Sequence, residues 1–153
     1  MKKSAGILLF RKLGRDCELF LVHPGGPFWK NKDEGAWSIP KGEFTEEEDA
    51  LAAAKREFKE ETGVNCNGKF IKLASVKLKS GKIVYAWALE KDIDPAKIKS
   101  NLFEMEWPPK SGKWQSFPEI DRGAWFTPAT AKQKINPAQV TFIDELLEKL
   151  KQA

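Results

Sequence analysis

Residues 45–62 contain the feature that most restricts what this chain can fold into, a helical stretch with two different faces that ends at Gly63. Leu51, Ala54 and Phe58 recur at helical spacing and predict a buried face. A second stripe beside it carries three carboxylates, and these are Glu57, Glu60 and Glu61. A helix of this kind packs one face on a core and lines the adjacent space with acids.

The three glutamates are unfavourable for the helix itself. Like charges three or four residues apart repel by about 0.2–0.5 kcal/mol per pair. They also precede the Thr62-Gly63 stop, at the negative end of the helix dipole, which costs about 0.3–1 kcal/mol each. A divalent cation reverses the sign of both effects. The pattern therefore predicts a metal site rather than an exposed acidic helix end.

The basic residues of the same helix are poorly placed to neutralise this stripe. Lys55 and Lys59 point away from the glutamates. Arg56 lies four residues before Glu60, and a base that precedes the acid is the less favourable order of such a pair. Arg56 could also reach back towards the start of the helix. We therefore expect the carboxylates to be largely available to a ligand.

Oxygen ligands of this type suit a hard divalent cation such as Mg²⁺. His23 is the only histidine, and Cys17 and Cys66 lie far apart in the sequence, which argues against zinc. There is no DxDxDG calcium loop, and the run from His23 to Pro27 lacks the lysine of a Walker phosphate loop. We expect that run to be an ordinary turn.

The length of 153 residues predicts one domain, and 41% hydrophobic with 31% charged residues predicts a globular rather than a disordered chain. Two cysteines form no disulfide framework, which fits a reducing cytoplasm. The apolar run after Lys2-Lys3 is too short to span a membrane and is expected to be a first strand.

Charge is distributed unevenly. Residues 43–61 hold eight acids and three bases, a net charge of −5, whereas the remainder holds 23 bases and 14 acids, a net charge of +9. An acidic island in a basic body suits a cation bound in the island and an anionic ligand lying across both.

The remaining pattern predicts an α/β (α+β) domain with a mixed sheet. Strands are expected at 4–11, 18–23, 37–41, 69–79, 82–90 and 123–126. Residues 24–36 are expected to form a loop, and residues 95–118 to be irregular. An amphipathic helix is expected at 137–151, with one face formed by Val140, Ile143, Leu147 and Leu150. Thr45 and Glu48 predict a capping box at the start of the acidic helix.

The acidic helix lies inside a longer motif. The run Gly42-x5-Glu48-x7-Arg56-Glu57-Phe58-x-Glu60-Glu61-x-Gly63-Val64 matches all nine specified positions of the Nudix box over 23 residues. With its N-terminal strands and the PEIDRGAWF segment, the chain resembles the small, MutT-like members of the Nudix hydrolase family over most of its length.

The resemblance implies a single domain over residues 1–153, an α/β/α sandwich with the box at the active site. It also implies hydrolysis of a nucleoside diphosphate linked to another moiety, with Mg²⁺ or Mn²⁺ as cofactor. A nucleoside triphosphate is the default substrate and a dinucleoside polyphosphate the runner-up. The partner is thus a small nucleotide, with no membrane or nucleic acid, and the chain is expected to be a cytoplasmic monomer or homodimer.

The resemblance also assigns roles to residues of the box. Glu57 and Glu61 are the expected metal ligands, Glu60 is close behind them, and the carbonyl of Gly42 adds another. Arg56 is expected to orient the acids, together with Glu48. Glu48 and Gly63 also have structural roles, as a cap and as the helix end.

Outside the box, the family resemblance implies a further catalytic carboxylate from a downstream loop. Glu119 is our choice, with Glu104 and Glu106 as rivals. Lys41 is placed to meet phosphate, and one of three aromatic residues is a candidate to stack on a base: Trp29, Phe103 or Trp107.

A second class of function is a non-catalytic module that binds nucleotide or RNA. Degenerate members of such families usually lose box acids, and this chain retains all of them. The known specificity marks of the family are absent: Ser80-Gly81-Lys82 stands where one would lie, and the SQPWPFP type of signature is missing. The sequence therefore favours the hydrolase and leaves its substrate open.

Overall fold

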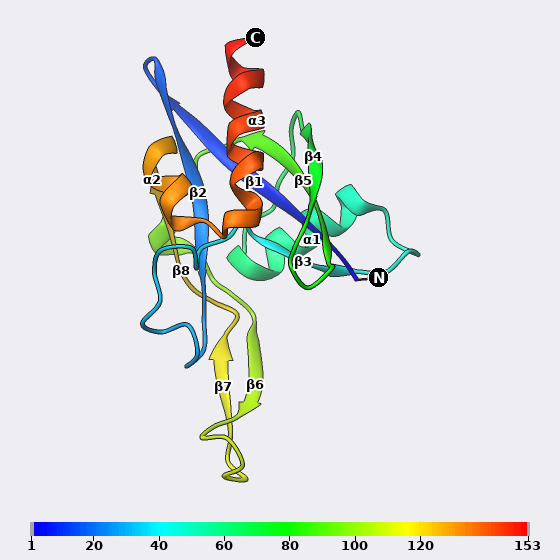
Figure 1. Cartoon of the computed structure of the whole chain (residues 1–153), viewed down its shortest axis with the longest axis vertical. Coiled ribbons are helices and arrows are strands. Elements are labelled where there is room, and N and C mark those ends of the chain that lie inside the picture. Colours follow the sequence, from blue (N-terminus) through cyan, green and yellow to red (C-terminus); the bar gives the residue numbers. More distant parts are fainter. Residues whose placement is uncertain (1, 153) are drawn as a thin grey trace.

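The computed structural model describes residues 2–152, and its centre is a mixed sheet built on the long apolar N-terminal runs (Figure 1). Strands β1 (Lys3–Leu13) and β2 (Asp16–Pro24) pair as an antiparallel hairpin. Strand β5 (Ile83–Glu90) runs parallel to β1 on its other edge. Seven consecutive residues of β1 are buried, as expected for a central strand covered on both faces.

The six-stranded sheet has the order β4-β5-β1-β2-β8, and β3 pairs separately with β1. The bounds of the other strands are Lys41–Phe44 for β3, Ile71–Lys77 for β4 and Ile120–Phe126 for β8. β3 pairs with the start of β1, residues 3–6, whereas β2 pairs with its end, residues 10–13. β3, the strand that carries Gly42, therefore pairs with the part of β1 that β2 does not reach.

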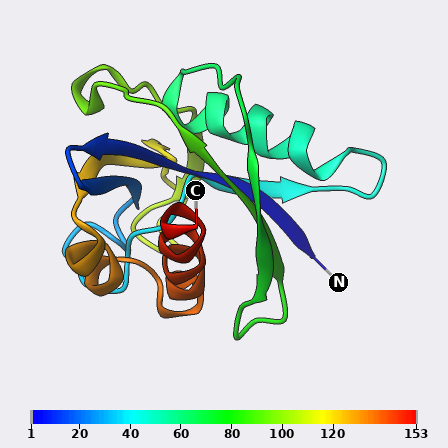
Figure 2. The ribbon, with the colours of Figure 1, turned by 90° about the horizontal axis from the view of Figure 1, so that it is seen from above.

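Helices cover both faces of this sheet, as Figure 2 shows. Helix α1 (Ala50–Thr62) packs on the face to which Ile7 of β1 belongs. Helices α2 (Pro128–Lys134) and α3 (Val140–Lys151) cover the face of Leu8. The α/β/α sandwich with a mixed sheet is thus confirmed. No helix within residues 2–152 is long and apolar enough to cross a membrane.

A two-stranded hairpin projects away from this body (Figure 1) and is called the arm below. It consists of β6 (Leu102–Glu106) and β7 (Trp114–Pro118), which pair antiparallel. The carboxylate of Glu106 accepts hydrogen bonds from the backbone N–H groups of Lys110 and Gly112, which shapes the turn at its tip. The expectation that residues 95–118 are irregular was therefore wrong. They also contain a short 3₁₀ helix, Pro95–Lys97.

Two other elements differ from the sequence predictions. Trp37 and Ser38 make only isolated bridges, so the short strand expected at 37–41 lies later, at Lys41–Phe44. Helix α2 was not predicted, although Thr127 caps it and Pro128 follows, a common start signal. The C-terminal helix is confirmed, with a 3₁₀ turn at Pro137–Gln139 before it and Ile143 buried on its inner face.

Candidate active site

Helix α1 begins later than the capping box predicts. The side chain of Asp49 accepts a hydrogen bond from the N–H of Ala52, and the helix starts at Ala50. The predicted box of Thr45 and Glu48 is therefore wrong, because Asp49 already satisfies a free N–H group of the first turn. At the other end Gly63 has φ +80° and caps the helix in the left-handed region, as predicted.

Gly42 allows the first of the glutamates to approach strand β3. A Cβ atom built on Gly42 would lie 2.0 Å from Oε2 of Glu57. Only a residue without a side chain leaves room for the carboxylate at this place. The buried face of α1, with Phe58 fully buried, sets the orientation that brings Glu57 there. Packing of α1 on the core therefore brings Glu57 next to Gly42, the first residue of the motif.

Arg56 forms a network with three acids. Its guanidinium donates to Glu48 at 2.8 and 2.9 Å, to Glu57 at 2.8 Å, and to Glu60 at 3.2 Å. These bonds raise the pKa of Arg56 further, so it is charged at all accessible pH values. The expected contact with Glu48 is present. The expectation that the stripe is largely free was wrong for Glu57 and Glu60, because Arg56 reaches both.

Glu61 is the most strongly perturbed acid of the site. It is buried, with 6% of its surface exposed. Burial raises the pKa of its carboxyl to about 8; the charges of Glu119 and Glu57 add to the shift, and Lys41 opposes it. Burial also raises the pKa of Glu57, with a second contribution from the charge of Glu60. Carboxylates grouped in this way favour the charged form only when a cation is close.

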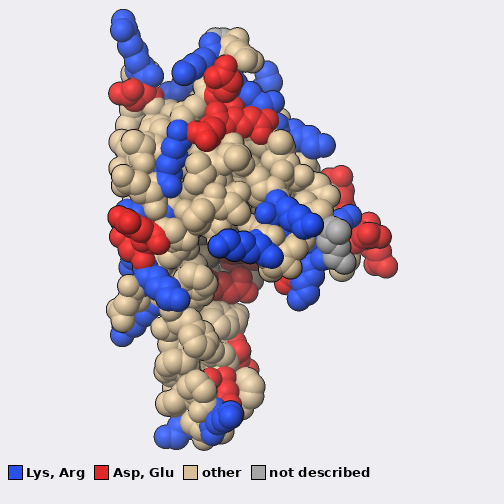
Figure 3. Space-filling view, in the orientation of Figure 1, with Lys and Arg blue, Asp and Glu red and all other residues tan. Residues whose placement is uncertain are grey.

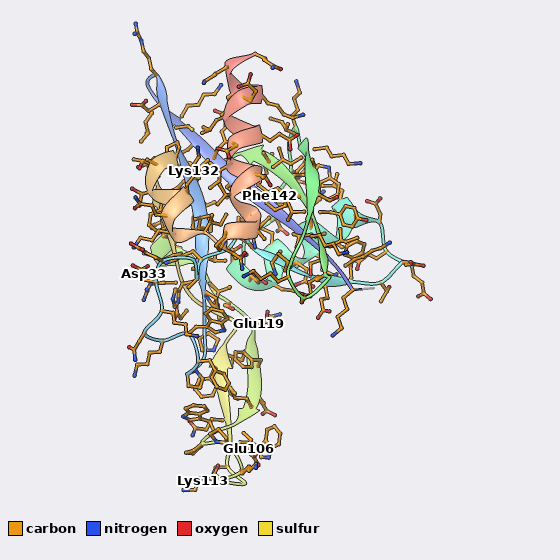
Figure 4. All side chains as sticks on the ribbon, in the orientation of Figure 1. Asp33, Glu106, Lys113, Glu119, Lys132 and Phe142 are labelled. Atoms are coloured by element: carbon orange, nitrogen blue, oxygen red, sulfur yellow. The ribbon has the colours of Figure 1, made fainter. Side chains whose placement is uncertain are left out.

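Glu119 lies where a downstream acid was expected. Figure 3 shows acidic side chains in a recess between the body and the arm, and Figure 4 places Glu119 at the base of the arm. The N–H of Glu119 donates to the carbonyl of Asn101, whose own N–H donates to the carbonyl of Glu60. Burial, followed by the charge of Glu60, raises the pKa of Glu119. This short chain of backbone bonds fixes the residue beside the end of α1.

The two rival acids are not brought to the site. Glu106 lies towards the far end of the arm (Figure 4), where its carboxylate is used by the turn. Glu104 is exposed on β6, opposite Ser116. Neither is among the charges that shift the pKa of Glu61. Of the three candidates, only Glu119 accompanies the carboxylates of α1.

Lys41 precedes Gly42 on β3 and is half-buried beside the acids. Burial lowers the pKa of its amine, and the charge of Lys82 lowers it further, whereas Glu61, Glu43 and Glu57 oppose the shift. Lys82 was not singled out in the sequence, because a lysine in a strand turn resembles any solvated lysine. It enters the site only through the pairing of β5 with β1.

The expected aromatic residues are divided between packing and exposure. Phe103 packs over Gly26, and its Cζ atom would lie 3.0 Å from a Cβ atom built on that glycine. The rings of Trp107 and Phe28 meet edge-on, with their centroids 5.3 Å apart. Trp29 remains 40% exposed. The arm thus uses two of the three candidates to attach itself to the loop at 24–36.

The donor set fits a hard divalent cation. The side-chain donors are carboxylate oxygens, and Glu61 is buried with no side-chain hydrogen-bond partner within residues 2–152. No group of three or more His, Cys, Asp or Glu in that part of the chain already converges on one point. A cation held by Glu57 and Glu60 would therefore have to share these carboxylates with Arg56 or displace it.

Comparisons with known proteins agree with this geometry. A family model described as the NUDIX domain matches residues 1–146. No curated protein matches the chain significantly. Among solved structures, an Ap4A hydrolase from C. elegans, in a binary complex, is 20% identical, with a TM-score of 0.69 and complete coverage of both chains.

Two further structures have the same fold. The NUDIX domain of Shewanella oneidensis NrtR, complexed with ADP ribose, is 15% identical with a TM-score of 0.66 and covers 97% of this chain and 87% of its own. A mutT/nudix family protein from Listeria innocua is 16% identical with a TM-score of 0.64 and covers 99% of this chain and 94% of its own.

Proposed function

This chain belongs to the Nudix family of hydrolases, which act on phosphoanhydride bonds, and we propose that it is a divalent-metal-dependent pyrophosphohydrolase of small nucleotides. The observation that carries the proposal is the pair of buried glutamates, Glu57 and Glu61, held against Gly42 and Lys41 at the end of α1. A nucleoside diphosphate linked to another moiety is the substrate class, and a nucleoside triphosphate is the first substrate to test.

Glu57 and Glu61 would hold Mg²⁺ or Mn²⁺, with Glu60 and the carbonyl of Gly42 as further ligands. The bound cation would neutralise phosphoryl charge and lower the pKa of a coordinated water. Arg56 orients the acids, because it contacts Glu48, Glu57 and Glu60 together. Its fixed charge keeps Glu57 in one position.

Lys41 is proposed to contact the phosphates of the substrate, since its amine is close enough to Glu61 and Glu57 for their charges to act on it. Glu119 is proposed as the group that accepts a proton from the attacking water. Its raised pKa brings the carboxyl nearer to the pH at which general bases are effective. Positioning and charge neutralisation account for most of the barrier in phosphoryl transfer.

A dinucleoside polyphosphate is the second candidate substrate. It is supported by the likeness to the C. elegans Ap4A hydrolase, which shares the fold at 20% identity. We also propose a reducing, cytoplasmic location, because Cys17 and Cys66 are both buried free thiols.

The proposal is tested with a panel of nucleoside triphosphates, dinucleoside polyphosphates and nucleotide sugars, with Mg²⁺ or Mn²⁺ and with identification of the products. We expect Glu61→Gln to lower kcat/KM by about 100-fold or more, because it removes one charged group from the reacting centre. Glu47→Gln, which changes an exposed acid nearby, should retain the wild-type value. Folding of both variants is checked by circular dichroism.

The proposal fails if the wild-type protein cleaves no member of the panel and instead binds RNA with strong salt dependence. The role proposed for Glu61 as a metal ligand is wrong if Glu61→Gln retains the wild-type kcat/KM with a normal metal requirement.

A further inference from the structure

A cavity of about 630 Å³ opens beside the turn between β4 and β5. Three of its lining residues are lysines and none is acidic, and the complete lining is Lys2, Lys77, Ser80, Gly81 and Lys82. Glycine and serine at the turn leave the lysine amines and backbone groups as its polar surface. The residues that line the cavity therefore supply donors and positive charge.

The positive charge of this cavity is poorly compensated. The side chain of Lys82 is only 24% exposed, yet its nearest carboxylate, that of Glu43, is 3.9 Å away. The same oxygen of Glu43 lies 3.9 Å from the amine of Lys2, so one acid faces two lysines at the outer limit of an ion pair. Lys77 forms no ion pair with any residue from 2 to 152. A concave surface of one sign of charge concentrates ions of the other sign.

The register of three strands brings one edge of the cavity near the candidate active site, because Lys82 lines the cavity, directly precedes β5, and carries a charge that acts on Lys41. Lys3 of β1 pairs with Ile83 of β5, and Ser4 pairs with Glu43 of β3. Glu43 and Lys41 are two residues apart on β3, on one face, which separates them by about 6.5–7 Å. Going from β3 across β1 to β5 covers two strand spacings, or about 10 Å. In Figure 3, basic side chains lie directly above the acidic recess.

Lys41 and the three lysines of the cavity are spread over a distance that matches an extended chain of linked phosphates better than a single phosphate. We propose that the cavity lined by Lys2, Lys77 and Lys82 binds the phosphates of the substrate that lie beyond the hydrolysed bond, and that the enzyme therefore prefers substrates with four or more linked phosphates. The direction in which the phosphate chain of the substrate lies rests on the proposed function, because the acids of α1 define where the bond is cleaved. Binding of a polyphosphate in the cavity does not depend on it.

The double variant Lys77→Ala/Lys82→Ala tests the cavity. The matched control is Lys12→Ala/Lys151→Ala, which removes two lysines that line a different cavity at the β1–β2 turn. Lys12 has the same kind of weak partner as Lys82, a carboxylate oxygen of Glu90 at 3.9 Å. The two double variants therefore lose the same charge, each from the lining of one cavity.

The first measurement is binding of inorganic tripolyphosphate to demetallated protein by calorimetry. Without a cation the acids of α1 repel this anion, so binding reports on the lysines. We expect the dissociation constant to rise at least about tenfold in Lys77→Ala/Lys82→Ala, and to stay within about twofold of wild type in the control. Equal affinity in all three proteins, or equal weakening in both variants, would overturn the proposal.

The second measurement compares KM for ATP, adenosine 5′-tetraphosphate and diadenosine tetraphosphate with Mg²⁺ present. Loss of the two lysines should raise KM for the tetraphosphates more than for ATP, with kcat little changed, because these residues bind and do not touch the reacting atoms. An equal rise for all three substrates contradicts the preference. Absence of any hydrolysis contradicts the proposed function instead, and the tripolyphosphate measurement still decides the cavity.

Discussion

Gly42 is the residue at which one added methyl group would alter the site most directly. Its missing side chain is filled by the carboxylate of Glu57, the movable end of a flexible side chain. A Cβ atom there would displace that carboxylate without disturbing the buried core. The position therefore separates catalytic geometry from stability.

We expect Gly42→Ala to lower kcat/KM by about 100-fold, since displacing a ligand group by about 1 Å can cost that much. The free energy of unfolding should change by less than about 1 kcal/mol. Steady-state kinetics and urea unfolding measure the two quantities. Gly112→Ala is the control for the kinetics alone: a Cβ atom at the tip of the arm meets nothing within 4 Å, although the φ of +74° at Gly112 strains any side chain there. A Gly42→Ala enzyme with wild-type kinetics would show that Glu57 does not need this position.

At the scale of elements, two residues are candidates to cap the start of α1, and these are Thr45 and Asp49. Asp49 accepts the hydrogen bond of the first turn, whereas Thr45 lies five residues before the helix. We expect Asp49→Ala to lower the free energy of unfolding by about 0.5–2 kcal/mol, and Thr45→Ala to change it by less than about 0.5 kcal/mol. Urea unfolding of both variants gives the comparison. The opposite order would restore the capping box that the sequence suggests.

This cap also illustrates what the sequence could and could not predict. The helix and its end at Gly63 follow from local spacing and turn chemistry, and Gly63 ends the helix where the sequence predicts, whereas the helix begins at Ala50 rather than at residue 45. The sequence gives no measure of which of two neighbouring polar residues takes the first free N–H group. Thr45 and Asp49 both satisfy the local rule, and only the path of the chain from β3 decides.

The arm was missed for a related reason. Its strands have only five residues each, and the Trp-Pro-Pro and Ser-Gly signals of the segment that joins them favour an irregular structure. They are held by Phe103 over Gly26 and by Trp107 on Phe28, contacts between segments distant in sequence. Lys82 was overlooked for the same reason, because its importance depends on the pairing of β5 with β1.

At the scale of the whole molecule, the buried acids link stability to pH and to the metal. The folded pKa of Glu61 is about 8, raised from an ordinary value of 4.5. The stability that this group contributes is therefore fully present below about pH 4.5 and is lost as the pH rises through about 8. The pKa values of Glu57 and Glu119 are raised in the same direction.

We therefore expect the Tm of demetallated protein to fall from pH 6 to pH 8.5 relative to that of Glu61→Gln. Mg²⁺ should raise the Tm of the wild-type protein more at pH 8.5 than at pH 6, because it binds the ionised carboxylates. Thermal unfolding with and without Mg²⁺ at both pH values measures this. Parallel curves for wild type and Glu61→Gln, with no larger effect of Mg²⁺ at high pH, would contradict the linkage.

Because the turn at residues 108–112 forms its hydrogen bonds within the arm, the length of that turn is free to vary as such a chain diverges. Asn101 and Glu119 are tied to each other and to Glu60 by backbone bonds, whereas the hydrogen bonds of the turn at 108–112 stay within the arm. Insertions or deletions in that turn would leave the inherited chemistry at α1 untouched. The arm is thus a module on which descendants can acquire new selectivity while the hydrolytic centre stays constant.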